Sequence, residues 1–364
     1  MTDFADFILT RVQNQIGFIT LNRPKALNSL SLEMIRSITQ TLLDWQERSD
    51  VRAVFIHGSH ERAFCAGGDI RFFYDVGTAT PLGDSALLED FFTEEYALNY
   101  LIHHYPKPYV SLLNGVVMGG GMGIAQAGPD NRLRIVTERT KMAMPEVNIG
   151  LFPDVGGGYF LSRCAGQIGT YLGLSGEIIN ASDAIYADLA DVYLPSEQIP
   201  ALMTLLEQSN TSDLRDSIRQ FAAPFQQQLN AGPLATNRNA LDQHFSHNNV
   251  AAIMASLQAD PSPFAQQTFK LMQTRSPLLM CVTLEQLQRG QKLSVAECLR
   301  MERTMVRHCF KHGEVLEGVR ALVVDKDMQP KWQPASLEEV SPELINSFFA
   351  EVWPAYAHPL RELN

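Results

Sequence analysis

Hydrophobic and polar positions change their spacing along the chain, and this change predicts where strands and helices lie. Residues 7–13 and 16–21 ("IGFITL") have the pattern of two short strands joined by a tight polar turn. Ser31 then precedes a run of apolar residues at helical spacing, so we expect it to cap a helix. That run comprises Leu32, Ile35, Ile38, Leu42 and Trp45.

One order of elements then recurs through the first half: a strand, a glycine-containing turn and a helix. Buried strands are predicted in "RAVFIHG", "YVSLLNG", "NRLRIVT" and "KMAM", and a helix over residues 85–104 that ends at "YPKP". The turns into helices are "ERAFCAGGDI", "VMGGGMGIAQAG" and "PDVGGGYFLSRCAG". Such an order predicts an α/β core whose glycine turns gather at one edge.

The second half has a different pattern. Residues 200–310 carry long helical periodicity and few strand signals. We therefore interpret residues 1–230 as the α/β core and residues 231–364 as a mainly helical C-terminal region that packs on it. The polar segment 226–250 has no assigned role.

Composition narrows the class of partner. The chain has 364 residues, 45% of them hydrophobic, and a net charge of -11, so it can bury a large core. No cluster of Lys and Arg is visible, and we expect no nucleic-acid partner. The most apolar segment, "YVSLLNGVVMGGGMGIAQAG", is interrupted by Asn114, Gln126 and glycines, so we expect no membrane partner either.

Cysteine usage and the N-terminus give an expectation for location. The five cysteines are odd in number and form no CxxC motif, which argues against a disulfide framework or zinc site and fits a reducing compartment. The first residues, "MTDFADF", are acidic and have the pattern of neither a signal nor a transit peptide. We therefore expect a cytoplasmic protein.

Two carboxylates stand in an unusual setting within "MAMPEVNIGLFPDVGGG". Glu146 and Asp154 each follow a proline and lie among apolar and glycine residues. A carboxylate in such surroundings costs free energy unless it has a partner or a task. One interpretation is that the two carboxylates take part in a reaction. The other is structural: Glu146 bonds a loop backbone, and Asp154 caps the helix expected in "VGGGYFLSR".

The turns "FCAGGD" and "MGGGMG" also allow two interpretations. "MGGGMG" lacks the GxGxxG spacing because residue 124 is Ile, and no GK[ST] follows, so neither nucleotide-binding motif is present. The glycines can simply allow tight packing of a strand against a helix. Alternatively, each turn presents one backbone N–H at a helix start, and the pair forms an oxyanion hole. The dipole of a helix beginning near Gly120 would reinforce it.

Five motifs in the same order resemble the crotonase (enoyl-CoA hydratase/isomerase) superfamily. They are "RPKALNSLS", "AFCAGGDI", "NGVVMGGGMG", "MPEVNIGLFPDVGGGYFL" and "SGEIINASDAIYADLADVYLP". The resemblance implies an α/β fold, a crotonase-like spiral of ββα units, here with a mainly helical C-terminal region. It also implies acyl-CoA thioester substrates, whose carbonyl oxygen is held by the N–H groups of Gly68 and Gly120.

Within this superfamily the chain resembles the 3-hydroxyisobutyryl-CoA hydrolases, through "FFTEEYALN", "GLFPDVGGGYFL", "SPLLMCVTLEQL", "ECLRMERTMVRH" and "LEGVRALVVDKDMQPKW". Hydratases carry a further glutamate at the position of Gly123 and usually glycine at that of Asp154. The resemblance therefore implies hydrolysis of a short 3-hydroxyacyl-CoA. Glu146 would be the general base or the nucleophile, and Asp154 would orient water or manage the proton. An insertion near "GPDNRL" and the segment "EVLEGVRA" depart from the family pattern.

The same resemblance implies substrate-binding positions. Glu95 would contact the 3-hydroxyl, in preference to its neighbour Glu94. The CoA part would lie along "RPKALNS" and "GGDIR", with Lys25 and Arg71 as candidate phosphate partners. The full set of candidate substrate-binding residues is Lys25, Ala26, Leu27, Ala66, Gly68, Asp69, Ile70, Arg71, Glu95 and Gly120.

No cofactor or metal is expected, because coenzyme A is part of the substrate. The pair His103–His104 lacks an HExxH frame, no GxSxG elbow exists, and Cys65 has the features of a buried structural cysteine. Two other functions stay open: an enoyl-CoA hydratase or isomerase, and a non-catalytic acyl-CoA-binding protein. A homo-oligomer is possible.

Overall fold

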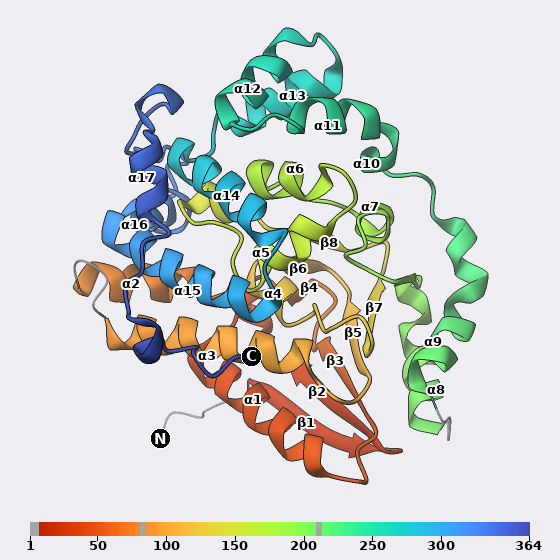
Figure 1. Cartoon of the computed structure of the whole chain (residues 1–364). Coiled ribbons are helices and arrows are strands. Elements are labelled where there is room, and N and C mark those ends of the chain that lie inside the picture. Colours follow the sequence, from red (N-terminus) through yellow and green to blue (C-terminus); the bar gives the residue numbers. More distant parts are fainter. Residues whose placement is uncertain (1–6, 81–84, 209–212) are drawn as a thin grey trace. The chain divides into compact units, whose positions relative to one another are not determined.

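The computed structural model describes residues 7–80, 85–208 and 213–364 (Figure 1). The expectation drawn from "MTDFADF" falls mostly on residues 1–6, which lie outside this range. The chain forms two compact units, each built from three stretches. The first comprises residues 1–68, 98–142 and 179–235; the second comprises 69–97, 143–178 and 236–364. The division at residue 230 was made along the sequence and stays a prediction.

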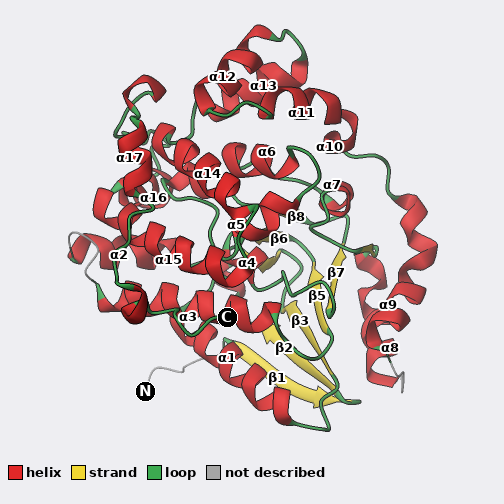
Figure 2. Ribbon diagram, in the orientation of Figure 1, coloured by secondary structure: helices red, strands yellow, loops and turns green. Residues whose placement is uncertain are grey.

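The first unit contains the strands, in a repeating order of two strands followed by a helix. The strands are β1 (Ile8–Gln13), β2 (Ile16–Leu21), β3 (Ala53–Gly58), β4 (Ala63–Cys65), β5 (Tyr109–Leu113), β6 (Val116–Met118), β7 (Arg132–Val136), β8 (Lys141–Ala143) and β9 (Val192–Tyr193). A six-stranded sheet has the order β1-β2-β3-β5-β7-β9, and a small sheet has the order β4-β6-β8 (Figure 2). From β3 to β8, successive strands alternate between the two sheets, so each pair of strands contributes to both.

The way in which neighbouring strands of the large sheet pair follows from the segments that connect them. β1 and β2 are joined by a two-residue turn and pair antiparallel, with Gln13 opposite Ile16. The neighbouring pairs β2–β3, β3–β5, β5–β7 and β7–β9 are parallel, as expected for strands whose connections pass through helices. The four strand regions predicted from the buried apolar runs are thus confirmed as β3, β5, β7 and β8.

Both faces of the large sheet are covered within this unit. Helix α1 (Leu32–Glu47) begins at Ser31, whose side chain accepts the N–H of Met34 at 3.3 Å, so the predicted cap is confirmed. The Trp45 ring lies over Gly17, where a Cβ would come within 2.3 Å of ring atoms. An apolar cluster of Phe18, Phe55, Val110, Leu133 and other strand residues includes the buried sides of α8 (Ile199–Gln208) and α9 (Leu214–Ala222).

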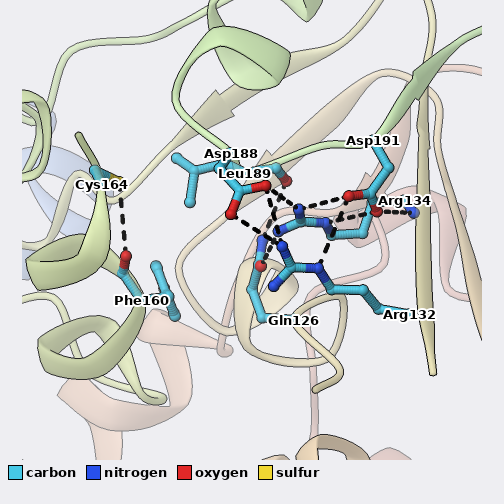
Figure 3. A network of polar contacts seen from close by, with 8 residues as sticks. All are labelled: Gln126, Arg132, Arg134, Phe160, Cys164, Asp188, Leu189 and Asp191. Carbon is cyan, nitrogen blue, oxygen red and sulfur yellow. Dashed lines mark hydrogen bonds and ion pairs between the residues drawn. The ribbon is translucent and has the colours of Figure 1, made fainter. Parts of the chain in front are cut away.

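A buried arginine ties β7 to the segment before β9 (Figure 3). Arg134 is 1% exposed, and its guanidinium binds both carboxylate oxygens of Asp191, at 2.9 and 3.0 Å. The Arg134 backbone N–H donates to the same carboxylate at 2.7 Å, and a third guanidinium nitrogen donates to Oε1 of Gln126 at 2.5 Å. This charge is therefore buried with a matched partner, which is the arrangement that makes burial tolerable.

The second unit is mainly helical, as predicted for the C-terminal region. After α2 (Ile70–Ala79) and the part of α3 (Ala86–His103) up to Ala97, it contains η3 (Glu146–Ile149), α5 (Gly157–Phe160) and α6 (Ile168–Ser175). Its C-terminal part contains α11 (Arg238–Phe245), α12 (Val250–Ala259), α13 (Pro263–Met272), α14 (Pro277–Gly290), α15 (Val295–His312), α16 (Glu314–Val319) and α17 (Pro342–Ser347). An aromatic cluster joins α2, α3 and α15 through Phe73, Phe91, Phe92 and Phe310.

Candidate active site

The two predicted glycine turns lie side by side in the first unit. β4 and β6 pair in parallel, with Cys65 opposite Val117, so both chains leave the small sheet at the same edge. A Cβ at Gly121 would lie 2.3 Å from the carbonyl oxygen of Cys65, and one at Gly67 would lie 3.1 Å from that of Met118. The positive φ of 102° at Gly67 and of 48° at Gly119 also favours glycine. Backbone thus approaches backbone where the two turns begin.

Gly68 is the next residue after Gly67, and Gly120 is the residue before Gly121. Gly120 is the first residue of α4 (Gly120–Gly123), a position whose N–H has no partner inside the helix. Among the described residues, no backbone acceptor is recorded for the N–H of either glycine. The expectation that a helix dipole reinforces this position needs correction, because α4 has four residues and sums few peptide dipoles.

The loop predicted to hold CoA lies beside the first turn. Lys25 and Ala26 belong to the short helix η1 (Pro24–Ala26), and Lys25 is exposed. Ala66 donates its N–H to the carbonyl of Leu27 at 3.1 Å. Asn28, which the sequence analysis did not single out, is 1% exposed and donates to the carbonyls of Ala63 and Phe64, each at 3.1 Å. The sequence feature that could have indicated this contact is the asparagine within the loop motif "RPKALNS".

The rest of "GGDIR" opens α2 in the second unit. Asp69 caps this helix by accepting the N–H of Phe72 at 3.3 Å, and Ile70 is the first helical residue. Arg71 is exposed and pairs with Asp75 at 2.9 Å. Its guanidinium therefore already has an anionic partner one helical turn away, on the solvent side.

The three predicted carboxylates all lie in the second unit and are all buried. Glu95 is on α3, Glu146 begins η3, and Asp154 precedes the turn into α5; they are 2%, 6% and 5% exposed. Tyr96 donates its phenolic O–H to Oδ2 of Asp154 at 2.7 Å. Oε1 of Glu95 and Oε2 of Glu146 are buried and accept no hydrogen bond from the described residues. Each therefore has an acceptor oxygen available to a ligand.

Burial raises the pKa of each of these carboxyl groups, and repulsion from neighbouring carboxylates raises the pKa of Glu95 and Glu146 further. Burial, followed by the charge of Asp154, holds the pKa of Glu95 well above its ordinary value. The same two causes, with the charges of Glu95 and Glu302, hold the pKa of Glu146 well above its ordinary value. Burial raises the pKa of Asp154 to about 6, although the hydrogen bond from Tyr96 lowers it. The cluster is therefore suited to proton transfer near neutral pH.

The alternative in which Asp154 caps a helix is not what the structure shows. The residue at the N-cap of α5 is Gly156, which offers no side chain, and the Asp154 carboxylate is turned to Tyr96 instead. The sequence reasoning missed Tyr96, which neighbours Glu95 on α3. It also missed Glu302 on α15, although Cys298, Leu299, Met305 and Val306 form a buried helical stripe around it. A glutamate within an apolar stripe is the signal that could have found it.

The chain belongs to the enoyl-CoA hydratase/isomerase family, whose model matches residues 16–349. It is similar to the 3-hydroxyisobutyryl-CoA hydrolase of Xenopus tropicalis, with 43% identity over 92% of this chain and 86% of that protein. The protein of the same name from Homo sapiens is 37% identical over 96% of this chain and 89% of its own length. The family predicted from the five motifs is therefore confirmed.

Solved structures confirm the predicted fold class. A structure titled carnitinyl-CoA dehydratase, from Mycobacterium thermoresistibile, matches with a TM-score of 0.88 and 39% identity over 96% of this chain and 98% of that one. One titled enoyl-CoA hydratase, from Rhodobacter sphaeroides, matches with a TM-score of 0.85 and 37% identity over 95% of this chain and 98% of that one. Both coverages extend through the helical C-terminal region.

The expectation of a cytoplasmic location is wrong by these comparisons. The Xenopus tropicalis and Homo sapiens hydrolases are both named as mitochondrial proteins. The five free cysteines fit any reducing compartment, so they could not separate these locations. Within the described part of the chain, no helix is long and apolar enough to cross a membrane.

Proposed function

We propose that this chain hydrolyses 3-hydroxyisobutyryl-CoA to 3-hydroxyisobutyrate and CoA, the reaction of valine breakdown implied by the resemblance. The observation that carries the proposal is the buried pair of Glu146 and Asp154, with glycine at position 123 where a hydratase has its further glutamate. Relatives named as this hydrolase, at 37–43% identity over more than nine-tenths of the chain, support it.

Gly68 and Gly120 are assigned to the thioester carbonyl. Their N–H groups would donate to the oxygen as it gains negative charge, which lowers the barrier by roughly 2.7–4 kcal/mol per donor in characterised enzymes. The close backbone contacts at the neighbouring residues Gly67 and Gly121 support this assignment, because they fix where the N–H groups lie.

Glu146 is assigned to the attack. As a general base it would remove a proton from water as the water oxygen adds to the thioester carbon, and the tetrahedral intermediate would then break its C–S bond and expel the CoA thiolate. As a nucleophile it would add to that carbon itself, expel the CoA thiolate and form a mixed anhydride that water opens. Its unpartnered Oε2 suits either role. Asp154, with its hydrogen bond from Tyr96, is assigned to orienting the water and managing the proton.

Glu95 is assigned to the 3-hydroxyl of the acyl group, which its unpartnered Oε1 could accept. The CoA moiety is assigned to Lys25, Ala26, Leu27, Asp69, Ile70 and Arg71, with the backbone of residues 68–70 contacting adenine and pantetheine. Ala66, Gly68 and Gly120 complete the set of residues proposed to bind the substrate. We expect the backbone to contribute more to CoA binding than Arg71 does, because Asp75 competes with a CoA phosphate for the Arg71 guanidinium.

Release of free thiol from a panel of acyl-CoAs tests the proposal. We expect turnover of 3-hydroxyisobutyryl-CoA and a fall in kcat of at least about 100-fold for Glu146→Gln, from the usual size of general-base effects. Full activity of that variant contradicts the assignment. A single turnover in ¹⁸O-water separates the two roles of Glu146, because label enters its carboxylate by the anhydride route alone.

A hydratase is the second candidate, because the two solved structures described above are named as a dehydratase and a hydratase. Hydration of crotonyl-CoA consumes the enoyl absorbance without releasing thiol, so the same panel distinguishes it from hydrolysis. Binding of every thioester without turnover of any would instead indicate a non-catalytic acyl-CoA-binding protein.

A further inference from the structure

The turn that follows Asp154 has a strained backbone. Val155 has a φ of 53° and Gly156 a φ of 88°, so two consecutive residues lie in the left-handed region. This region is a genuine outlier for a β-branched residue, and it persists where surrounding contacts hold it. Something must therefore stabilise this turn against relaxing to an ordinary conformation.

Glu302 of α15 binds the part of the turn that follows Asp154. Its Oε2 accepts the N–H of Gly156 and its Oε1 accepts the N–H of Gly158, both at 2.8 Å. The fit is close, because a Cβ at Gly158 would lie 3.0 Å from that Oε1. Glu302 is 0% exposed, and burial raises its pKa to about 8 although the two glycine N–H groups lower it.

Gln286 of α14 binds the part of the turn that precedes Asp154. Its Nε2 donates to the carbonyl of Pro153 at 2.7 Å and to Oε1 of Glu302 at 3.2 Å. Two buried side chains thus hold three backbone groups, one before Asp154 and two after it. All of these residues belong to the second unit.

We infer that Glu302 and Gln286 are positioning residues for the hydrolysis, holding the Pro153–Gly158 turn so that the Asp154 carboxylate faces Tyr96. This rests on the proposed function of Asp154. Neither residue is assigned contact with the substrate. A displaced carboxylate lowers the rate steeply, since reacting groups misplaced by about 1 Å can cost about 100-fold.

Glu302→Gln is the sharpest variant, because it keeps the shape of the side chain. The amide offers one oxygen to two N–H donors, so its –NH2 group faces the other N–H and the turn loses a hydrogen bond. Glu314→Gln is the matched control. Glu314 is likewise buried, and its carboxylate accepts the Ser276 hydroxyl and the N–H of Gln333, neither of which belongs to the turn.

The experiment compares thiol release by wild type, Glu302→Gln, Asp154→Asn, the double variant and Glu314→Gln. We expect kcat of Glu302→Gln to fall about 10- to 100-fold with KM within about threefold. In the Asp154→Asn background the further fall should be less than about threefold, because the positioned group is already gone. An unchanged kcat, or an equal factor in both backgrounds, overturns the inference. Glu314→Gln should keep kcat.

Two further measurements cover the remaining outcomes. If Glu302→Gln does not fold, Gln286→Met removes the contact to Pro153 with similar volume, and kcat unchanged in that variant overturns the inference. A wild type that releases no thiol contradicts the proposed function instead. Amide hydrogen exchange at Gly156 and Gly158 does not depend on the reaction. It should accelerate in Glu302→Gln but not in Glu314→Gln, and unchanged exchange overturns the inference even then.

Discussion

The phenol of Tyr96 donates a hydrogen bond of 2.7 Å to Oδ2 of Asp154, and both side chains are buried. The two residues are 58 positions apart in the sequence. Because the bond stabilises the ionised carboxylate, it lowers the pKa of Asp154 against the effect of burial, which raises that pKa to about 6.

Tyr96→Phe should therefore change the pH at which Asp154 titrates. Loss of the hydrogen bond raises the pKa of Asp154 further, so the limb of the rate–pH profile that reports this carboxyl shifts to higher pH. We expect a shift of roughly 0.5–1 unit, corresponding to a hydrogen bond of about 1 kcal/mol. The measurement is kcat/KM for thiol release between pH 5 and 9.

Tyr105→Phe is the control for this change. Tyr105 is also buried, and its hydroxyl donates to the carbonyl of Leu42 at 2.9 Å in the first unit. It should lose a similar amount of stability without moving either limb of the profile. A limb that stays in place in Tyr96→Phe would contradict the role of this hydrogen bond.

Glu95→Met should weaken discrimination between acyl groups, because Met has a similar length and no carboxylate oxygen to accept a hydrogen bond. If Oε1 of Glu95 accepts the 3-hydroxyl, the variant loses rate with 3-hydroxyisobutyryl-CoA but much less with isobutyryl-CoA, which has no hydroxyl to bind. We expect the ratio of the two kcat/KM values to fall at least about tenfold, the equivalent of roughly 1.4 kcal/mol. Glu94→Met, at the half-buried neighbouring position, should leave the ratio unchanged. Equal losses with both substrates argue against a hydroxyl contact.

Glu314 should make the stability of the protein depend on pH. Burial raises the pKa of Glu314 to about 7, above its ordinary value of 4.5. Between these values the folded state binds the proton more tightly than the unfolded state, so the free energy of unfolding falls as the pH rises through this window. Relative to Glu314→Gln, wild type should lose up to about 3 kcal/mol between pH 5 and 8. Urea unfolding at each pH measures the free energy of unfolding of both proteins. If the difference between the two proteins stays constant with pH, the prediction is refuted.

Arg134→Met should destabilise the first unit strongly. The substitution removes both guanidinium hydrogen bonds to the carboxylate of Asp191, which is 19% exposed, and leaves it the more distant guanidinium of Arg132, at 3.8 Å. Removal of one member of a buried pair costs about 3–5 kcal/mol. Arg132→Met is the matched change on the same strand. That arginine pairs at 3.0 Å with Asp188, whose side chain is 76% exposed, and lies 3.8 Å from the carboxylate of Asp191. This change should cost about 1 kcal/mol or less. Similar urea midpoints for the two variants would contradict this difference.

Local patterns were enough to predict most of the fold. The cap at Ser31, the short strands and the glycine turns each depend on residues a few positions apart, and the structure has them where the sequence predicted them. The sequence also indicated Glu146 and Asp154, because a carboxylate among apolar residues is conspicuous without knowledge of its partners.

The partners of those carboxylates could not be predicted in the same way. Tyr96 and Glu302 lie far from Asp154 in the sequence, and no local rule pairs them. Helix α3 is apolar on much of its surface, so the sequence does not indicate which face carries the phenol toward Asp154. The capping interpretation failed for the same reason: it considered the nearest N–H groups and not a distant tyrosine.

The contacts of Glu302 become available late while a ribosome makes this protein. The chain extends by 302 − 154 = 148 residues between the codon for Asp154 and that for Glu302, which takes roughly 7–30 s at 5–20 residues per second. During that interval the nascent chain contains the "PDVGGG" turn but not the carboxylate that binds Gly156 and Gly158. A translation product that stops before α15 therefore retains every glycine motif and both carboxylates, yet we expect it to be inactive.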